Sequence, residues 1–417
     1  MRGRRPPVAI TGVGLLSPLA DCPRTLHRRL AEGASGLQPL TSFPGDGLPV
    51  QRAAELNGFS PENYLGEGNL RPLDRTSRLA AAAAKLALEA GGWTPELAAE
   101  QEVGLVLGTM FGSARTIFEF DRRALTAGPG YVKPFDFANS VINAAAGQAA
   151  IWHGLRGVNA TVAGGVTAGL QALCYADDLL RGGRARTLLA GGADELCFES
   201  FFGFCRQGLV AGSNGRSEAV AVPFHSARGG FVPGEGAALL LLEEVSHAAA
   251  RGGPVLGEIR GHGACFDTSR GRDPGASAGA MARAVRLALD DAGVTPARVV
   301  CWSASASGRR DGDRAEAAGV AEALGDVARE LPVLAVKGQL GEALGASGAF
   351  QTVAALQSLR CGRSPGIADL DRVEEGFPFP LAGEADRPLA SGVALITALG
   401  LDGDACALVL GPAREGG

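Results

Sequence analysis

A chain of 417 residues exceeds the usual single domain of roughly 100 to 200 residues, so two domains or one fold built from two halves are expected. A net charge of −5 with only three lysines leaves no basic stripe for nucleic acid, and no uninterrupted apolar run of about 18 residues suggests a membrane span. Eight isolated cysteines, without a CxxC pair, indicate reduced thiols and a cytoplasmic protein.

The predicted elements, taken in chain order, occur twice. The first series is a strand at 8–13, a helix at 78–90 and a strand from Val103; the second is a strand at 257–263, a helix at 280–291 and a strand from Val299. The two helices end in similar segments, LALEAGGWTP and LALDDAGVTP, and glycine at each end favours a left-handed cap. Continuous apolar strands indicate sheets covered by helices on both faces. The sequence therefore predicts an α/β fold of two pseudo-repeats, 1–250 and 251–417.

A sharp turn is predicted between a strand at 159–163 and a helix from about Thr167, in NATVAGGVTAGLQAL. Such a turn exposes the residue at its apex, here Val166, and directs the free amides and positive dipole end of the helix towards it. This geometry suits a nucleophile. Because valine is inert, the turn is either an ordinary tight turn or a former active site.

Other candidate sites have weaker support. TGVGLLS is a poor dinucleotide motif, since Ser17 stands at its third glycine position and prolines follow. His262 and Cys265 are too few ligands for zinc, and Cys205 in FFGFCRQG is expected to be buried and inert. We expect neither a metal nor a cofactor.

Three longer segments resemble the β-ketoacyl synthases of the thiolase-like superfamily: VAITGVGLLSPLA, VINAAAGQAAIWHGLRG and VPFHSARGGFVPGEGAALLLLE. The resemblance covers nearly the whole chain and implies a five-layered αβαβα fold. Active members carry a cysteine that accepts the acyl chain and two histidines that assist malonyl decarboxylation and stabilise the oxyanion. At those three positions this chain has Val166, Ser305 and Glu342, whereas the family residues Glu316 and Lys337 are retained.

The site of the carrier arm is altered too. Ser307 and Arg309 replace the family's threonines, and 400–403 reads GLDG in place of the gating turn GFGG. This pattern resembles the chain length factor, the ketosynthase β subunit of bacterial type II polyketide synthases. Valine in place of the glutamine common in aromatic systems favours the polyene type.

Chain length factors form heterodimers with a catalytic ketosynthase α subunit, receive acyl carrier protein through the complex, and line the tunnel for the growing chain. The resemblance therefore implies a partner surface at 143–153 and 159–163, and a tunnel helix at 108–121. The residues expected to line the tunnel are Met110, Phe111, Ala114, Ile117 and Phe118.

Two alternatives remain open. The chain could be an acyltransferase with substituted chemistry, in which Ser305 or Glu342 acts on a different thioester. It could also be a homodimeric binding protein that inherited the fold.

Overall fold

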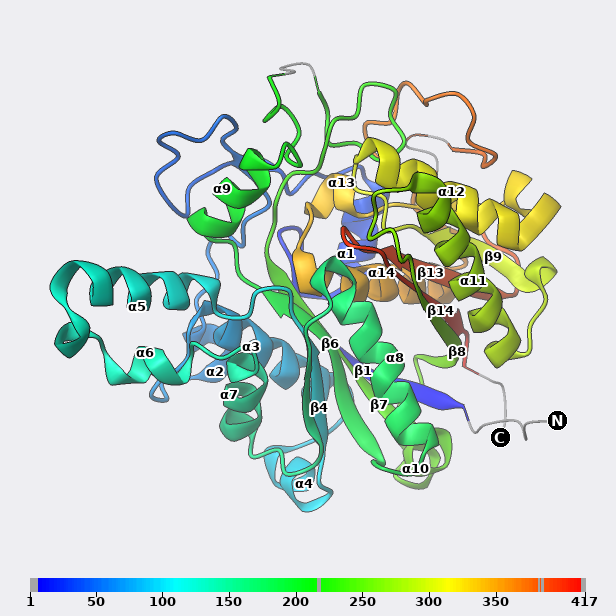
Figure 1. The fold of residues 1–417 in the computed structure, drawn as a ribbon. Coiled ribbons are helices and arrows are strands. Elements are labelled where there is room, and N and C mark those ends of the chain that lie inside the picture. The colour runs from blue at the N-terminus through cyan, green and yellow to red at the C-terminus, as the bar shows by residue number, and fades with distance from the viewer. Residues whose placement is uncertain (1–6, 216–218, 382, 384–385, 414–417) are drawn as a thin grey trace.

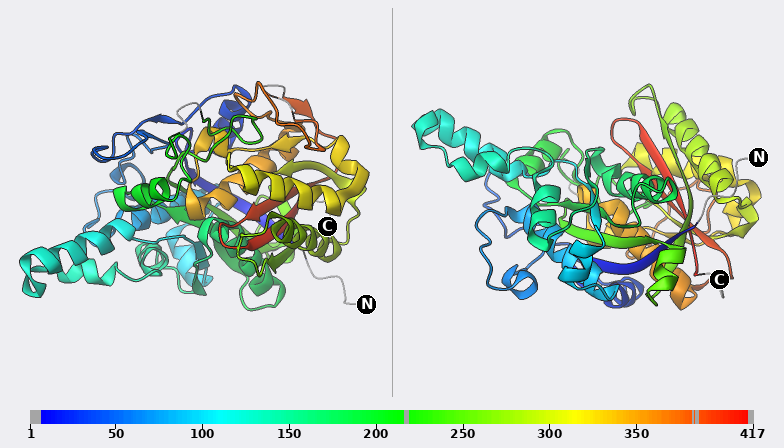
Figure 2. Two further views of the ribbon diagram at one scale, coloured as in Figure 1. Left: turned by 45° about the horizontal axis from the view of Figure 1, so that its top comes forward. Right: turned by 90° about the horizontal axis from the view of Figure 1, so that it is seen from below.

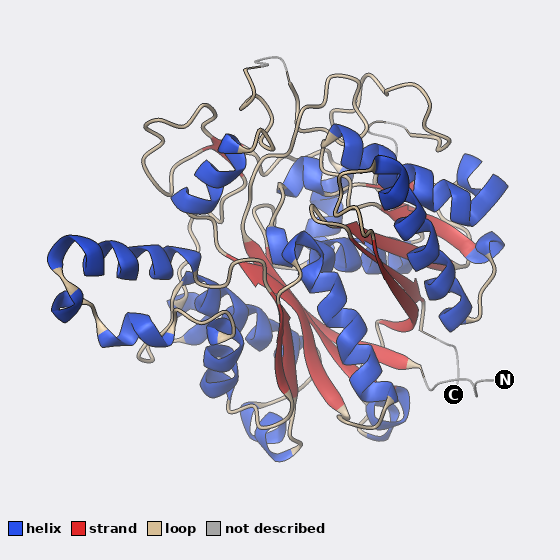
Figure 3. Ribbon diagram, viewed as in Figure 1, coloured by secondary structure: helices blue, strands red, loops and turns tan. Residues whose placement is uncertain are grey.

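The computed structural model describes residues 7–215, 219–381, 383 and 386–413, and shows helices packed around one ten-stranded sheet (Figures 1 and 3). The sheet consists of two five-stranded parts with the same order, β1-β7-β6-β4-β5 and β8-β14-β13-β9-β10, joined where β1 pairs with β8. In each part four strands run in the same direction, and one, β7 or β14, runs antiparallel to them. The fold is therefore built from two pseudo-repeats, as predicted.

The strands of the first repeat are β1 (Val8–Leu16), β4 (Gly104–Gly108), β5 (Asn159–Val162), β6 (Thr187–Asp194) and β7 (Gly236–Glu244). Those of the second are β8 (Gly257–Phe266), β9 (Val299–Ser303), β10 (Val333–Leu334), β13 (Val393–Leu399) and β14 (Asp404–Gly411). Two short pairs lie outside the sheet: β2 (Gln38–Pro39) with β3 (Arg52–Ala53), and β11 (Arg363–Ser364) with β12 (Arg387–Pro388).

Three layers of helices alternate with the two sheet parts. The first outer layer contains α3 (Arg75–Ala90) and α7 (Ala144–His153); the central layer contains α8 (Ala168–Arg181) and α14 (Ser347–Cys361); the second outer layer contains α11 (Pro274–Ala292) and α12 (Arg310–Leu324). The remaining helices are α1 (Pro23–Ala31), α2 (Glu62–Leu65), α4 (Pro95–Glu100), α5 (Ala114–Ala127), α6 (Pro134–Ala138), α9 (Phe198–Arg206), α10 (Val245–Ala250) and α13 (Lys337–Leu340). This is the five-layered arrangement predicted from the sequence.

The repeat extends to individual contacts. Gly12 and Gly14 of β1 face α3, where an added Cβ would lie 2.2 Å or less from a backbone oxygen of the helix. Gly261 and Gly263 of β8 face α11 in the same way, with added Cβ atoms 2.8 and 2.3 Å from backbone oxygens of that helix. Each glycine pair thus permits close packing of a helix on its strand. We propose that the halves divide between residues 250 and 251, after α10.

The predicted helix caps are confirmed in one repeat only. Gly293 after α11 is left-handed, with φ +64°, but Gly91 after α3 has φ −84°, and the left-handed residue is Gly92, at φ +74°. Among the described residues, no helix combines the length and apolar character that crossing a membrane requires.

Helices α5 and α6 form an arm that extends away from the layers (Figures 1 and 2). The arm follows β4 and leads back to α7, beside the edge strand β5. Several large apolar side chains of this region are exposed, and they are considered below.

Candidate functional site

The predicted turn at Val166 is present, but its apex is not exposed. Strand β5 ends at Val162, Gly165 takes a left-handed conformation with φ +59°, and α8 begins at Ala168 after a short 3-10 turn. Val166 is only 4% exposed because it belongs to an apolar cluster with Phe201, Leu344 and other side chains. The prediction of an exposed apex was therefore wrong, since the side chain at this position packs into the interior.

The residues at the three degenerate positions come together around one small cavity of about 10 Å³. Such a volume accommodates about one water molecule. The cavity is lined by Val166, Ser305, Ala306, Ser307, Arg309, Gly312, Asp313, Glu316, Lys337, Glu342, Leu399 and Leu401. The structure thus unites every predicted degenerate position with both retained family residues.

Ser305 is held by the retained carboxyl group of Glu316. Its backbone amide and its hydroxyl donate to Oε1 of Glu316 at 2.8 and 2.9 Å, and the amide of Leu399 donates to the hydroxyl at 3.0 Å. Thr397 donates to the same carboxyl oxygen at 2.6 Å. Burial raises the pKa of Glu316 to about 7 despite these hydrogen bonds. The hydroxyl of Ser305 is thus engaged in hydrogen bonds within the protein, as donor to Glu316 and as acceptor from Leu399.

Glu342 forms a buried ion pair with Lys337, whose Nζ lies 2.7 Å from Oε2. The hydroxyl of Ser347 donates to Oε1 at 2.6 Å, and the amide of Glu342 donates to the carbonyl of Val232 at 2.8 Å. Both charged side chains are almost fully buried. The negative charge that replaces a histidine is therefore neutralised by a residue that the family retains.

Arg309 and Leu401 occupy the route that the resemblance assigns to the carrier arm. Arg309 precedes the first turn of α12 and lines the cavity together with Leu401. Burial lowers the pKa of Arg309, while the nearby carboxylates of Asp313 and Glu342 act in the opposite direction. A long charged side chain thus lines the same small cavity as the degenerate positions.

The predicted tunnel helix begins later than expected. Met110 and Phe111 lie in a turn between β4 and α5, so the helix expected at 108–121 begins only at Ala114. The cause is Asp194, whose carboxylate accepts hydrogen bonds from the amides of Met110 and Phe111 at 2.7 and 3.2 Å. These bonds hold the segment in a turn instead of a helix.

Asp194 was missed in the sequence analysis. Besides the turn after β4, it accepts hydrogen bonds from the hydroxyl of Thr109 at 2.6 Å and from the amide of Gly345 at 2.7 Å. It therefore ties that turn to the loop after Glu342, and burial raises its pKa to about 6. The available signal was an acidic residue at the end of a buried apolar strand, in LLAGGADE.

The predicted tunnel residues differ in their surroundings. Met110 and Phe111 are half-buried and pack against the apolar cluster that contains Val166. Ala114 is buried at the start of α5, Ile117 is half-buried, and Phe118 is 51% exposed on the arm. These residues therefore run from the degenerate site outward along the arm.

A much larger cleft, of about 870 Å³, contains none of the degenerate positions. It lies among segments at 35–52, 211–215, 219–222 and 369–372, and its charged lining includes His225 and Asp371, which pair with each other at 2.7 Å. Cys205 is buried, and burial raises the pKa of its thiol to about 11, which agrees with the predicted inert cysteine.

Comparison with known proteins identifies the family. Residues 5–248 match the β-ketoacyl synthase N-terminal domain, and residues 256–371 match the C-terminal domain. A 3-oxoacyl-[acyl-carrier-protein] synthase 2 of Coxiella burnetii is 30% identical over 404 residues, which span 97% of this chain and 98% of that protein. The same-named protein of Rhizobium meliloti is 30% identical over 413 residues, spanning 97% and 98%.

Solved structures agree with this assignment. The ishigamide ketosynthase/chain length factor superimposes with a TM-score of 0.90 at 27% identity, covering 98% of this chain and all of that one. A β-ketoacyl synthase from Burkholderia phymatum gives 0.89 at 26%, with the same coverage. The matched domains, the relatives and the assembled degenerate site together show that this chain belongs to the β-ketoacyl synthase family.

Proposed function

We propose that this chain is a non-catalytic chain length factor, which forms a heterodimer with an active ketosynthase and shapes the acyl tunnel of a type II polyketide synthase. The observation that carries the proposal is the very small cavity around Val166, Ser305 and Glu342. It leaves room for about one water molecule, whereas a covalently bound acyl chain and a carrier arm would need an open channel. An intact fold around a site that is too small for the substrate suits a structural subunit.

The chemistry of the site supports the same conclusion. Valine has no lone pair with which to attack a thioester, and the Ser305 hydroxyl is already bonded to Glu316. Glu342 is paired with Lys337, and an anion beside a developing oxyanion would raise the barrier by Coulomb repulsion. These contacts weigh against the alternative in which Ser305 or Glu342 performs substituted acyl transfer.

The proposed partner surface has the apolar character that an interface core requires. Strand β5 is an edge strand, and α7 beside it carries Ile151 with its side chain 77% exposed. Monomeric proteins rarely leave such side chains together in water. The exposed apolar residues of the arm and its return to α7 are Phe118, Leu125, Tyr131, Phe135, Phe137, Val141, Ile142 and Ile151.

In this arrangement the arm would present the tunnel residues to the partner. Met110, Phe111, Ala114, Ile117 and Phe118 remain our proposed tunnel lining, now as a turn followed by a helix. The ishigamide ketosynthase/chain length factor supports the pairing by its structural similarity. Acyl carrier protein would reach the tunnel through the active subunit of the heterodimer.

The proposal is tested by comparing the chain alone with the complex. We expect the purified chain, incubated with acyl and malonyl carrier proteins, to form no elongated product and no covalent acyl adduct in intact-protein mass spectrometry. Co-expressed with a ketosynthase that has its cysteine and both histidines, it should co-purify and support elongation. Elongation by the chain alone, or an acyl adduct on it, would contradict the proposal. A stable homodimer that does not bind the ketosynthase would favour the binding-protein alternative.

A single charge should disrupt the heterodimer. Ile151→Asp places a carboxylate at the centre of the proposed interface, and we expect the affinity for the ketosynthase to fall by more than about tenfold, as at an interface hot spot. Leu287→Asp is the matched control, because Leu287 is 49% exposed on α11 in the opposite outer layer. Size-exclusion chromatography with light scattering measures both, and equal weakening by the two substitutions would place the interface elsewhere.

A further inference from the structure

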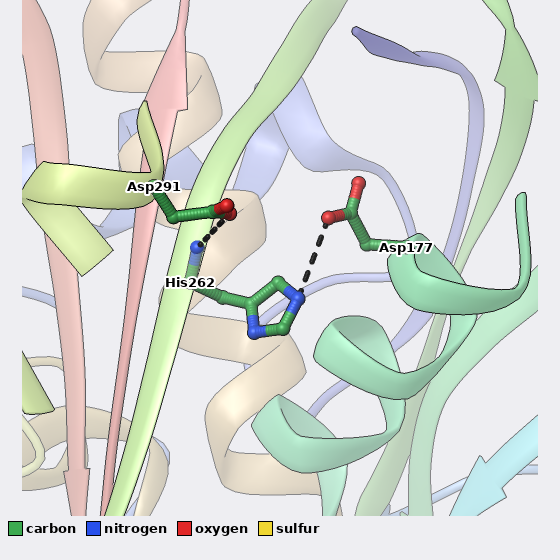
Figure 4. Close-up of side chains that lie close together, drawn as sticks. All are labelled: Asp177, His262 and Asp291. Carbon is green, nitrogen blue, oxygen red and sulfur yellow. Dashed lines mark hydrogen bonds and ion pairs between the residues drawn. The ribbon is translucent and has the colours of Figure 1, made fainter. Parts of the chain in front are cut away.

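A polar cluster lies where the two repeats meet, remote from the residues that line the degenerate site. His262 of β8 points towards Asp177 of α8, with Nε2 3.5 Å from Oδ2, and Asp291 near the end of α11 accepts a hydrogen bond from the backbone amide of His262 at 3.3 Å (Figure 4). One nitrogen or oxygen atom from each side chain lies within 4.8 Å of the others. Three elements thus contribute one potential metal ligand each.

The pseudo-repeat provides an internal reference for this cluster. Gly261 and Gly263 match Gly12 and Gly14 by their contacts with the helix, so His262 occupies the position that Val13 has in the first repeat. Val13 is a buried core residue. Asp291 likewise corresponds to Ala90 in the aligned helix ends. The scaffold therefore accepts apolar residues at both positions, and packing alone does not require histidine and aspartate there.

The ligand atoms already have charged neighbours within the protein. Asp177 is fully buried, and its Oδ2 pairs with Nε of Arg181 at 2.8 Å, while Nε2 of His262 lies 3.4 Å from Oδ1 of Asp178. A neutral imidazole has the lone pair that a metal needs, and Nε2 of His262 faces the carboxyl group of Asp177.

We propose that Asp177, His262 and Asp291 bind a divalent transition-metal cation of the zinc type. One imidazole nitrogen and two carboxylate oxygens are ligands that such a cation accepts, and three protein ligands leave a position for water. Bonds of about 2.0–2.2 Å hold two ligand atoms at most about 4.4 Å apart, so the cluster needs only a small contraction. The bound metal would fasten α8 of one repeat to β8 and α11 of the other.

Arg181 competes with the metal for the same carboxylates. Its Nε lies 2.8 Å from Oδ2 of Asp177, and another guanidinium nitrogen lies 3.5 Å from Oδ2 of Asp291. The same side chain also donates to the carbonyl of Ile259 at 3.3 Å. Metal binding therefore requires Arg181 to withdraw from Asp177, and removal of Arg181 should strengthen binding.

The experiment measures Zn²⁺ binding to the full chain by isothermal titration calorimetry at pH 7.5. We expect one site that His262→Gln weakens at least about tenfold, the scale found when even supporting residues of a metal site are removed. Asp290→Asn is the matched control, because Asp290 is an exposed carboxylate next to Asp291. This variant should bind Zn²⁺ with the same affinity as the wild type. Mg²⁺ should not bind, since it prefers oxygen ligands and water to imidazole.

A second variant separates a metal site from a simple ion-pair network. Arg181→Met leaves the buried Asp177 without its guanidinium, so it should lower the melting temperature, and Zn²⁺ should raise that temperature more in this variant than in the wild type. The proposal is overturned if the wild type binds no Zn²⁺, if His262→Gln binds as well as Asp290→Asn, or if Zn²⁺ fails to stabilise Arg181→Met. None of these results depends on the proposed polyketide function.

Discussion

Glu342→Gln should lower the free energy of unfolding by about 3–5 kcal/mol, the cost of leaving one member of a buried ion pair without its partner. Glutamine keeps the shape of the side chain and can still accept from Ser347, but it removes the charge that lies 2.7 Å from Nζ of Lys337. Lys337 is buried, so bulk water cannot solvate its charge in place of the lost carboxylate. Urea unfolding followed by circular dichroism measures the difference.

The control replaces both charges. Lys337→Met combined with Glu342→Leu substitutes apolar side chains of similar volume, and such replacements of buried ion pairs are often neutral or stabilising. We expect the double variant to recover most of the lost stability. If Glu342→Gln were as stable as the wild type, or if the double variant were as unstable as the single one, the pair would not hold this site together.

The fold could be predicted from the sequence because its signals are local. Similar helix ends occur in both halves of the sequence, and each half has a strand with two glycines. In the structure these glycines contact equivalent positions of α3 and α11. The three degenerate positions could also be assigned, since each lies in a short motif, and the structure brings Val166, Ser305 and Glu342 together as those motifs imply.

The features that were missed depend on contacts between distant segments. The turn at Met110 follows from Asp194 on another strand, whereas the family resemblance implied a helix that already began at residue 108. The burial of Val166 follows from the apolar side chains, such as Leu344, that pack around it. His262 was considered with Cys265 in the sequence, whereas the structure places it beside Asp177 and Asp291 because α8 packs against the other repeat. Sequence spacing contains no information on such neighbours.

A second large effect, on the pH dependence of folding stability, is expected from Glu195, a buried carboxyl group beside the base of the arm. Burial, followed by repulsion from Asp74, raises its pKa to about 8, although the backbone amide of Arg115 at the start of α5 donates to it at 3.1 Å. The pKa in the unfolded chain is near 4.3. The folded state therefore favours the neutral acid, and its stability decreases as the pH rises from about 4 through 8.

Glu195→Gln should remove this dependence while keeping the hydrogen bond from Arg115, because a glutamine oxygen accepts in the same way. Each pKa unit corresponds to about 1.4 kcal/mol, so the variant should exceed the wild type by a few kcal/mol at pH 8.5 and by much less at pH 5. Other buried carboxyls with raised pKa values, such as Asp194 and Glu316, are present in both proteins and cancel in the comparison.

Urea midpoints measured from pH 5 to pH 9 test this expectation, with Glu199→Gln as the control for removing one nearby half-buried glutamate. Parallel loss of stability in the wild type and in Glu195→Gln would show that Glu195 does not supply the pH dependence. If the two profiles diverge as expected, ionisation of Glu195 destabilises the base of the arm, because Glu195 accepts a hydrogen bond from the start of α5. The arm carries the proposed partner surface, so association with the ketosynthase should then also weaken above about pH 8 in the wild type and persist in the variant.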